Sequence, residues 1–98
     1  MVVWKYDILL KSGIQKIRMP KGAKVLTAQV QRENDGYDDI KIWCLIDNGQ
    51  AELELVDRHF ILRGTGHSFA VSNSYPLNYI GTVQIDYSVW HIFEIIGV

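Results

Sequence analysis

The chain has 98 residues, of which 48% are hydrophobic and 21% charged, with one cysteine and a formal net charge of −1. This length and composition suit one globular domain over residues 1–98 and exclude a disordered chain. They also exclude extended nucleic acid as a partner, because eleven acidic side chains would repel a long polyanion. A lone cysteine and the lack of an 18-residue apolar run favour a cytoplasmic protein with no membrane partner.

Charge is distributed unevenly along the chain. Residues 1–24 carry a net charge of +5 and residues 25–98 a net charge of −6. This polarity would attract an anionic ligand to the N-terminal region or pair one subunit with another. Solvated strand faces explain the same pattern more simply.

Short runs of β-branched and aromatic residues, separated by turn residues, predict an all-β and mainly antiparallel fold. We expect a small sandwich or partly open barrel of roughly seven or eight strands. The first two strands, at 3–10 and 14–19, are predicted to form a hairpin around Ser12 and Gly13. A third strand follows and alternates apolar with polar residues, and the polar 32–39 stretch predicts an exposed loop.

The strand at 40–46 is apolar on both faces, which predicts a central position in its sheet or a covering partner. Asn48-Gly49 predicts a type I′ turn that leads into another hairpin. Residues 51–58 suit either a strand or one short helix. After an irregular stretch, strands near 79–85 and 88–96 are predicted to form a C-terminal hairpin.

The glycine-bounded segment 63–68 is the best candidate binding site. Its members are Arg63, Gly64, Thr65, Gly66, His67 and Ser68. Backbone amides beside glycine, two hydroxyls, a guanidinium and an imidazole suit a phosphate or carboxylate. No Gly-Lys-Ser/Thr follows, so the segment is not a P-loop, and a tight strand exit or bulge would explain the glycines equally well.

Other chemistry has weaker support in the sequence. His91 and Glu94 would share one face of a helix, but on a strand they point to opposite faces, so we predict no metal site and no cofactor. Cys44 lies between apolar strand residues, which predicts a buried, inert thiol with a raised pKa. No nucleophile has a base that the sequence places beside it, so we predict no enzymatic activity.

Six runs of sequence resemble a family of small uncharacterised proteins found mostly in bacteriophages and prophages. They are residues 20–26, Val30-Gln31, residues 43–47, Gly-Thr-Gly-His at 64–67, Tyr-Ile-Gly-Thr-Val-Gln at 79–84 and Val-Trp-His-Ile-Phe-Glu at 89–94. The resemblance runs nearly end to end and implies a phage setting without a known activity. The 32–39 loop is longer than in that family, and Ser68 stands where the family commonly has proline, so a family partner does not transfer to these surfaces.

From these observations we expect a non-enzymatic phage protein that forms a homo-oligomer and captures a small anionic ligand, such as a nucleotide signal of host defence. Segment 63–68 would hold the charge, beside His91, and Trp43, Tyr79 or Trp90 would stack on a base. The alternatives are an inhibitor that blocks a host protein through the acidic stretch 33–57, and a small virion accessory protein.

Overall fold

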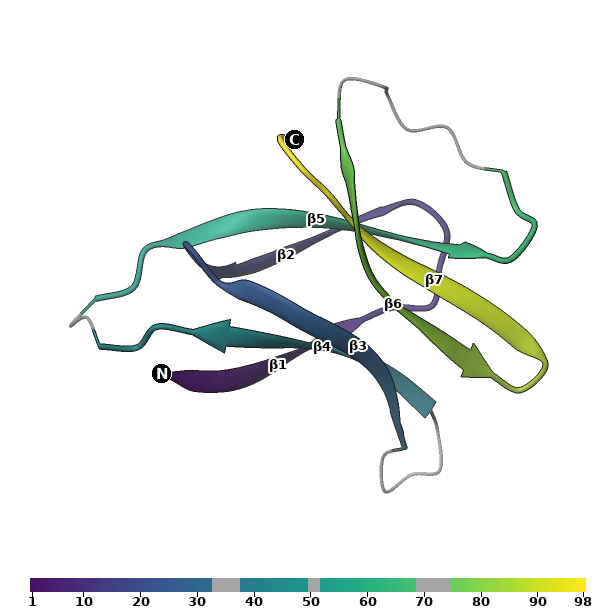
Figure 1. Cartoon of the computed structure of the whole chain (residues 1–98), viewed down its shortest axis with the longest axis horizontal. Helices are drawn as coiled ribbons and strands as arrows, with labels where there is room; N and C mark the ends of the chain where they lie inside the picture. Colours follow the sequence, from purple (N-terminus) through teal and green to yellow (C-terminus); the bar gives the residue numbers. More distant parts are fainter. Residues whose placement is uncertain (33–37, 50–51, 69–74) are drawn as a thin grey trace.

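The structure of the protein is a computed structural model that describes residues 1–32, 38–49, 52–68 and 75–98. Its secondary structure is entirely β in these residues (Figure 1). The strands are β1 (Val2–Ile8), β2 (Ile14–Pro20), β3 (Lys24–Arg32), β4 (Asp38–Ile46), β5 (Leu55–Gly64), β6 (Leu77–Ile85) and β7 (Ser88–Ile95). The predicted all-β class is confirmed, and the helix considered for 51–58 is wrong for the residues described there.

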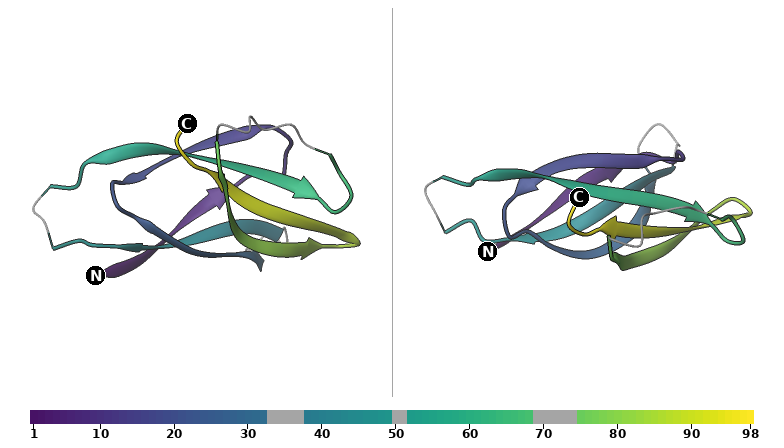
Figure 2. Two further views of the ribbon diagram at one scale, coloured as in Figure 1. Left: turned by 45° about the horizontal axis from the view of Figure 1, so that its top comes forward. Right: turned by 90° about the horizontal axis from the view of Figure 1, so that it is seen from above.

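The strands form two antiparallel sheets that stack as a sandwich. One sheet has the order β1-β4-β3 and the other the order β2-β5-β7-β6. The molecule is flat, with principal extents of 44 × 40 × 16 Å, and its edge-on profile is visible in Figure 2. A sandwich is therefore correct, and the alternative of a barrel is not, since the two sheets do not close on each other.

The core fills the space between the two sheets. Its fully buried members include Met19, Ile42, Cys44, Ile46, Phe60, Leu62 and Ile92. They come from four strands and alternate along each strand with outward residues, as the two-residue period of a strand requires. Burial of these apolar side chains is the main source of stability for the domain.

The predicted N-terminal hairpin is wrong, because β1 pairs with β4 and β2 pairs with β5. The side chain of Gln15 explains why the chain changes sheets. Its amide donates to Leu9 O over 2.6 Å and its carbonyl accepts from Leu9 N over 2.9 Å. The backbone groups that would continue a hairpin are therefore occupied by a buried side chain.

The hairpin predicted at Asn48-Gly49 is also wrong, since β4 and β5 lie in different sheets. A type I′ turn needs positive φ at both central residues, and neither Asn48 nor Gly49 has it. Asp47 accepts a hydrogen bond from Gly49 N through its carboxylate instead, over 3.1 Å. This Asx-type turn leads the chain away from its own strand.

Residues 55–58 form a strand because their side chains alternate between the core and the outside. Val56 packs inward and Leu55 outward, and β5 pairs with β2 from Leu55↔Pro20 to Ile61↔Ile14. Tertiary pairing thus overrides the helix propensity of Ala, Glu and Leu in this stretch.

Two further predictions concern β4 and the C-terminus, and both are confirmed. β4 is the central strand of its sheet, between β1 and β3. β6 and β7 form a hairpin, in which Asp86 adopts a positive φ of 54°. Most of the predicted 32–39 loop lies outside the described residues.

Candidate functional site

The segment 63–68 forms a tight turn where β5 ends. Gly64 O accepts a hydrogen bond from His67 N over 3.0 Å, which closes a four-residue β-turn. Gly66 occupies the third position of this turn with a φ of +83°, a conformation that favours glycine. Thr65 N donates to Val89 O over 3.1 Å, so the turn is fixed to the start of β7.

A second glycine, Gly64, allows the imidazole of His67 to lie against the backbone. A Cβ atom at this position would be 2.7 Å from His67 Nδ1 and 2.8 Å from Cε1. The imidazole of His67 also contacts the indole of Trp90, at 6.0 Å between ring centroids and an interplanar angle of 77°. Edge-to-face packing of this kind stabilises the ring position. The pattern Gly-Thr-Gly-His therefore fixes a histidine between a backbone and an indole.

Two hollows adjoin His67 and Trp90. One has a volume of about 280 Å³ and is also lined by Gly64, Thr65 and residues 87–89. The other has a volume of about 420 Å³ and is also lined by Ser12, Leu62, Arg63 and Ser68. In both hollows, polar groups from β5 and the turn after it line one side, and the Trp90 ring from β7 is part of the lining.

Neither of these hollows has a carboxylate among its described lining residues. The side chains there that can carry a positive charge are Arg63 and His67. Arg63 Nη1 donates to Leu62 O over 2.7 Å, which holds the guanidinium near the strand. By contrast, two hollows at the other end of the molecule contain Asp57 with Glu94, and Asp47 with Glu54. The 63–68 end is thus the one whose lining suits an anion.

His91 connects this turn to the outward face of the four-stranded sheet. Its Nε2 shares a hydrogen bond with Thr65 Oγ1 over 2.7 Å, and its Nδ1 shares one with Thr82 Oγ1 over 2.9 Å. Thr82 Oγ1 also lies 2.5 Å from the Tyr79 hydroxyl. The four side chains form a continuous hydrogen-bonded chain from the rim of the smaller hollow to an exposed phenol. The partners of His91 are therefore the hydroxyls of two threonine side chains.

The indole nitrogens of Trp90 and Trp43 are both buried, and within the described part of the chain neither has a hydrogen-bond partner. An unsatisfied buried donor costs about 1–3 kcal/mol. Because Trp43 shares this state on the other sheet, the unpartnered Nε1 of Trp90 does not by itself mark a site.

Trp43, another predicted stacking residue, lies apart from this group. It belongs to β4 in the three-stranded sheet, and Lys5 Nζ is 5.8 Å from the centroid of its ring. The fold therefore brings Trp90, His91 and Tyr79 toward the 63–68 turn and leaves Trp43 on the other sheet. Separation along the sequence could not show which aromatic residues lie near the 63–68 turn, because the order of the strands in the sheets decides this.

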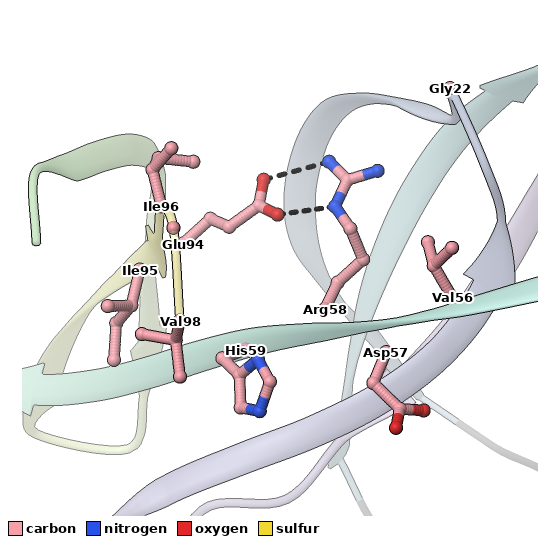
Figure 3. Close-up of a pocket in the computed structure, with 10 residues that line it drawn as sticks. Gly22, Val56, Asp57, Arg58, His59, Glu94, Ile95, Ile96 and Val98 are labelled. Carbon is pink, nitrogen blue, oxygen red and sulfur yellow. Dashed lines mark hydrogen bonds and ion pairs between the residues drawn. The ribbon is translucent and has the colours of Figure 1, made fainter.

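A buried ion pair is the feature that the sequence analysis missed. Arg58 and Glu94 point toward each other beside a hollow of about 320 Å³ (Figure 3). The pair is bidentate, with Nε–Oε2 at 2.5 Å and Nη2–Oε1 at 2.9 Å, and Arg58 Nη1 donates to Ala23 O over 2.7 Å. The hydrogen bond to Glu94 raises the pKa of Arg58. The available signal was alternation, which places both residues on inward positions of β5 and β7.

Cys44 is fully buried in the core, as predicted. Burial raises the pKa of its thiol to about 11, while Arg58 lowers it and Glu94 raises it by smaller amounts. A neutral, buried thiol is a poor nucleophile. Cys44 therefore acts as a small core side chain.

The potential metal ligands in the described residues are scattered. No group of three or more His, Cys, Asp and Glu side chains in them is arranged to hold a metal ion. His91 lies outward and Glu94 inward on β7, as strand geometry predicts. Nor do these residues contain a helix of the length and apolarity needed to cross a membrane.

Comparison with known proteins identifies a family without an assigned activity. The chain belongs to the family described as Domain of unknown function (DUF7352), whose profile matches residues 1–96. No curated protein and no solved structure matches the chain. Membership of an uncharacterised family is thus confirmed over nearly the whole chain, whereas the phage setting and the six motif runs stay predictions.

Proposed function

We propose that this member of a family of unknown function binds a small anionic ligand at the 63–68 turn and does not transform it. The observation that carries the proposal is the lining of the two hollows beside His67. Arg63 and His67 supply positive or donor groups, Thr65 and Ser68 supply hydroxyls, and no carboxylate is present among the described lining residues. Such a lining favours phosphate or carboxylate over a cation.

A nucleotide is the ligand class that uses the site most fully. Its phosphate would bind the turn, and its base would pack on Trp90, which lines both hollows. The phage setting adds a biological form of the same proposal, in which a homo-oligomer in the host cytoplasm captures a nucleotide signal of host defence. The formal net charge of −1 opposes a ligand of one to three charges far less than it opposes a long polyanion.

The alternative of a host-protein inhibitor has less support. It requires the acidic stretch 33–57 to present free negative charge. Asp57, however, lies 3.2 Å from Arg18 and 3.9 Å from Lys16, and Glu54 lies 3.6 Å from Lys21. The basic N-terminal region therefore neutralises part of this stretch, although exposed pairs of this kind are individually weak.

The first test is native mass spectrometry of the protein from infected or defence-active cells, followed by calorimetric titration with nucleotides and inorganic phosphate. We expect bound mass that is lost on denaturation. We also expect R63A and H67A to weaken affinity by about tenfold or more, since each removes a charged or donor group from the ligand. K24A, which removes a cation from an exposed position of β3, is the matched control and should bind normally. Unchanged affinity in R63A and H67A would disprove the assignment of this site.

A further inference from the structure

Four strands form the open edges of the two sheets, and two of these edges face each other. β3 and β6 are irregular, with register shifts between Val25 and Thr27 and between Tyr79 and Gly81. They also pack closely, since a Cβ atom on Gly81 would lie 3.3 Å from Ala28 N. Bulges and covering are the usual means by which a protein prevents pairing at a sheet edge. This side of the sandwich is therefore protected.

The other two edge strands, β1 and β2, are regular, and their charges distinguish them. β2 carries Lys16 and Arg18 on its outward face and ends at Pro20. Two copies of β2 side by side would oppose like charges, and proline would end the ladder. β1 pairs with β4 from Val2 to Ile8 without a register shift, and its outward face carries Lys5 and Asp7, which have opposite charges.

The N-terminal region also exposes large apolar side chains. Five of them lie within the first ten residues, namely Met1, Val3, Trp4, Leu9 and Leu10. Trp4 remains 39% exposed although it lies on the inward face of β1, opposite Cys44. In Figure 1 β1, drawn in purple, begins at the margin of the molecule near the N-terminus and overlaps β4 farther along. Its second edge pairs with no strand among the described residues.

We propose that a second copy of this chain covers this edge, with β1 of one subunit antiparallel to β1 of the other. Tyr6 would lie opposite Tyr6 of the partner subunit, on the twofold axis. Lys5 would then lie opposite Asp7 of the partner subunit, and the symmetry repeats this pair. The two three-stranded sheets become one six-stranded sheet, and both copies of the edge ladder are satisfied.

Charge selects this register from the alternatives. A shift that moves the axis to residue 5 places Lys5 opposite Lys5 of the partner subunit and leaves Asp7 opposite Val3 of the partner subunit. A shift by an odd number of residues would place outward side chains opposite inward ones, which the pleat forbids. In the proposed register Trp4 instead lies opposite Ile8 of the partner subunit, so apolar residues meet on the inward face.

The proposal can be tested by a charge exchange measured with sedimentation equilibrium. K5E alone places an acid opposite Asp7 of the partner subunit, and D7K alone places Lys5 opposite a second lysine. Each variant should dimerise at least about tenfold more weakly than the wild type, because two attractive pairs become repulsive. An equimolar mixture of K5E with D7K should recover a heterodimer, since both cross-strand pairs are then of opposite charge.

A matched control keeps the test decisive if D7K folds poorly, which is a concern because Asp7 also forms an ion pair with the buried Lys41. K24E makes the same charge change on the outward face of the same sheet, at the β3 edge. It should dimerise normally while K5E does not. A wild-type monomer at all concentrations, or equal dimerisation of K5E and K24E, would overturn the proposal. Ligand binding at the 63–68 turn is measured separately, so either proposal can fail without the other.

Discussion

Strands β5 and β7 run side by side, and the two ends of this pair treat polar groups in opposite ways. At one end Arg58 and Glu94 form a bidentate pair in which each charge has a fixed partner inside the protein. At the other end Thr65 and His67 stand at a turn beside Trp90, whose Nε1 has no partner within the described residues. Satisfied charges near the core contribute to structure, whereas exposed or unsatisfied polar groups beside a hollow are available to a ligand.

The largest effect on stability is expected when one charge of the buried pair is removed. E94A leaves the Arg58 guanidinium without its carboxylate, and we expect a loss of roughly 3 kcal/mol of stability, as for other half-broken buried pairs. The Arg58 side chain keeps 21% of its surface exposed, which places the effect at the lower end of that class. Urea denaturation of E94A measures the loss.

The double variant R58M/E94L is the control for this prediction. It replaces both charges by apolar side chains and should be more stable than E94A, because no uncompensated charge remains. If E94A were as stable as the wild type, the ion pair would have no structural role.

A second prediction concerns the pH dependence of stability near this pair. Burial raises the pKa of the Cys44 thiol from 9.0, the value for an exposed thiol, to about 11, so the folded state favours the neutral thiol. The resulting stability is fully present below pH 9 and is lost as the pH rises through 11. Free energies of unfolding measured between pH 8 and 11 should fall less steeply for C44A. If the free energy of unfolding fell equally steeply with pH for C44A and the wild type, the raised pKa of the Cys44 thiol would be contradicted.

The smallest effect on stability is expected at the other end of the strands, from G64A. The added Cβ collides with the His67 ring, which is exposed and can rotate away at a cost of about 1 kcal/mol or less. Ligand affinity, however, should fall because the imidazole leaves its place between Gly64 and Trp90. Thermal unfolding and calorimetric titration of the same variant measure the two effects.

G81A provides the reverse pattern as a control. Its Cβ would meet the backbone of Ala28, which cannot move as a side chain can, so stability should fall while ligand affinity is kept. If G64A lost stability and kept affinity instead, His67 would belong to the fold and not to the site.

Local sequence patterns predicted the elements of this fold better than their partners. Apolar residues on both faces located β4 as a central strand, and the spacing of short strand and turn patterns located the β6–β7 hairpin, because both follow from residues near one another. β1 pairs with β4 and β2 with β5, and the Gln15 side chain occupies the backbone of Leu9, where a hairpin between β1 and β2 would continue. No periodicity reveals that a particular side chain replaces a backbone partner.

The candidate site was predicted in part for the same reason. Gly64, Thr65, Gly66 and His67 are neighbours in sequence, so their shared turn could be inferred. Their contacts with Trp90 and His91 arise from the pairing of β5 with β7, in which Gly64 lies opposite Trp90 and Arg63 opposite His91. The motifs drew attention to Trp90 and His91 from the sequence, but only strand order separated Trp90 from Trp43.

The crossing of the chain between sheets also determines when each strand can be completed during synthesis. β1 cannot pair until β4 has left the ribosome, and β2 cannot pair until β5 has done so. Long closures of this kind are slow, whereas the β6–β7 hairpin closes locally. The registers Val2↔Ile46 and Ile14↔Ile61 span long stretches of chain, so β1 and β2 are both made well before their partners. The N-terminal region is therefore the part of the nascent protein most dependent on protection by chaperones.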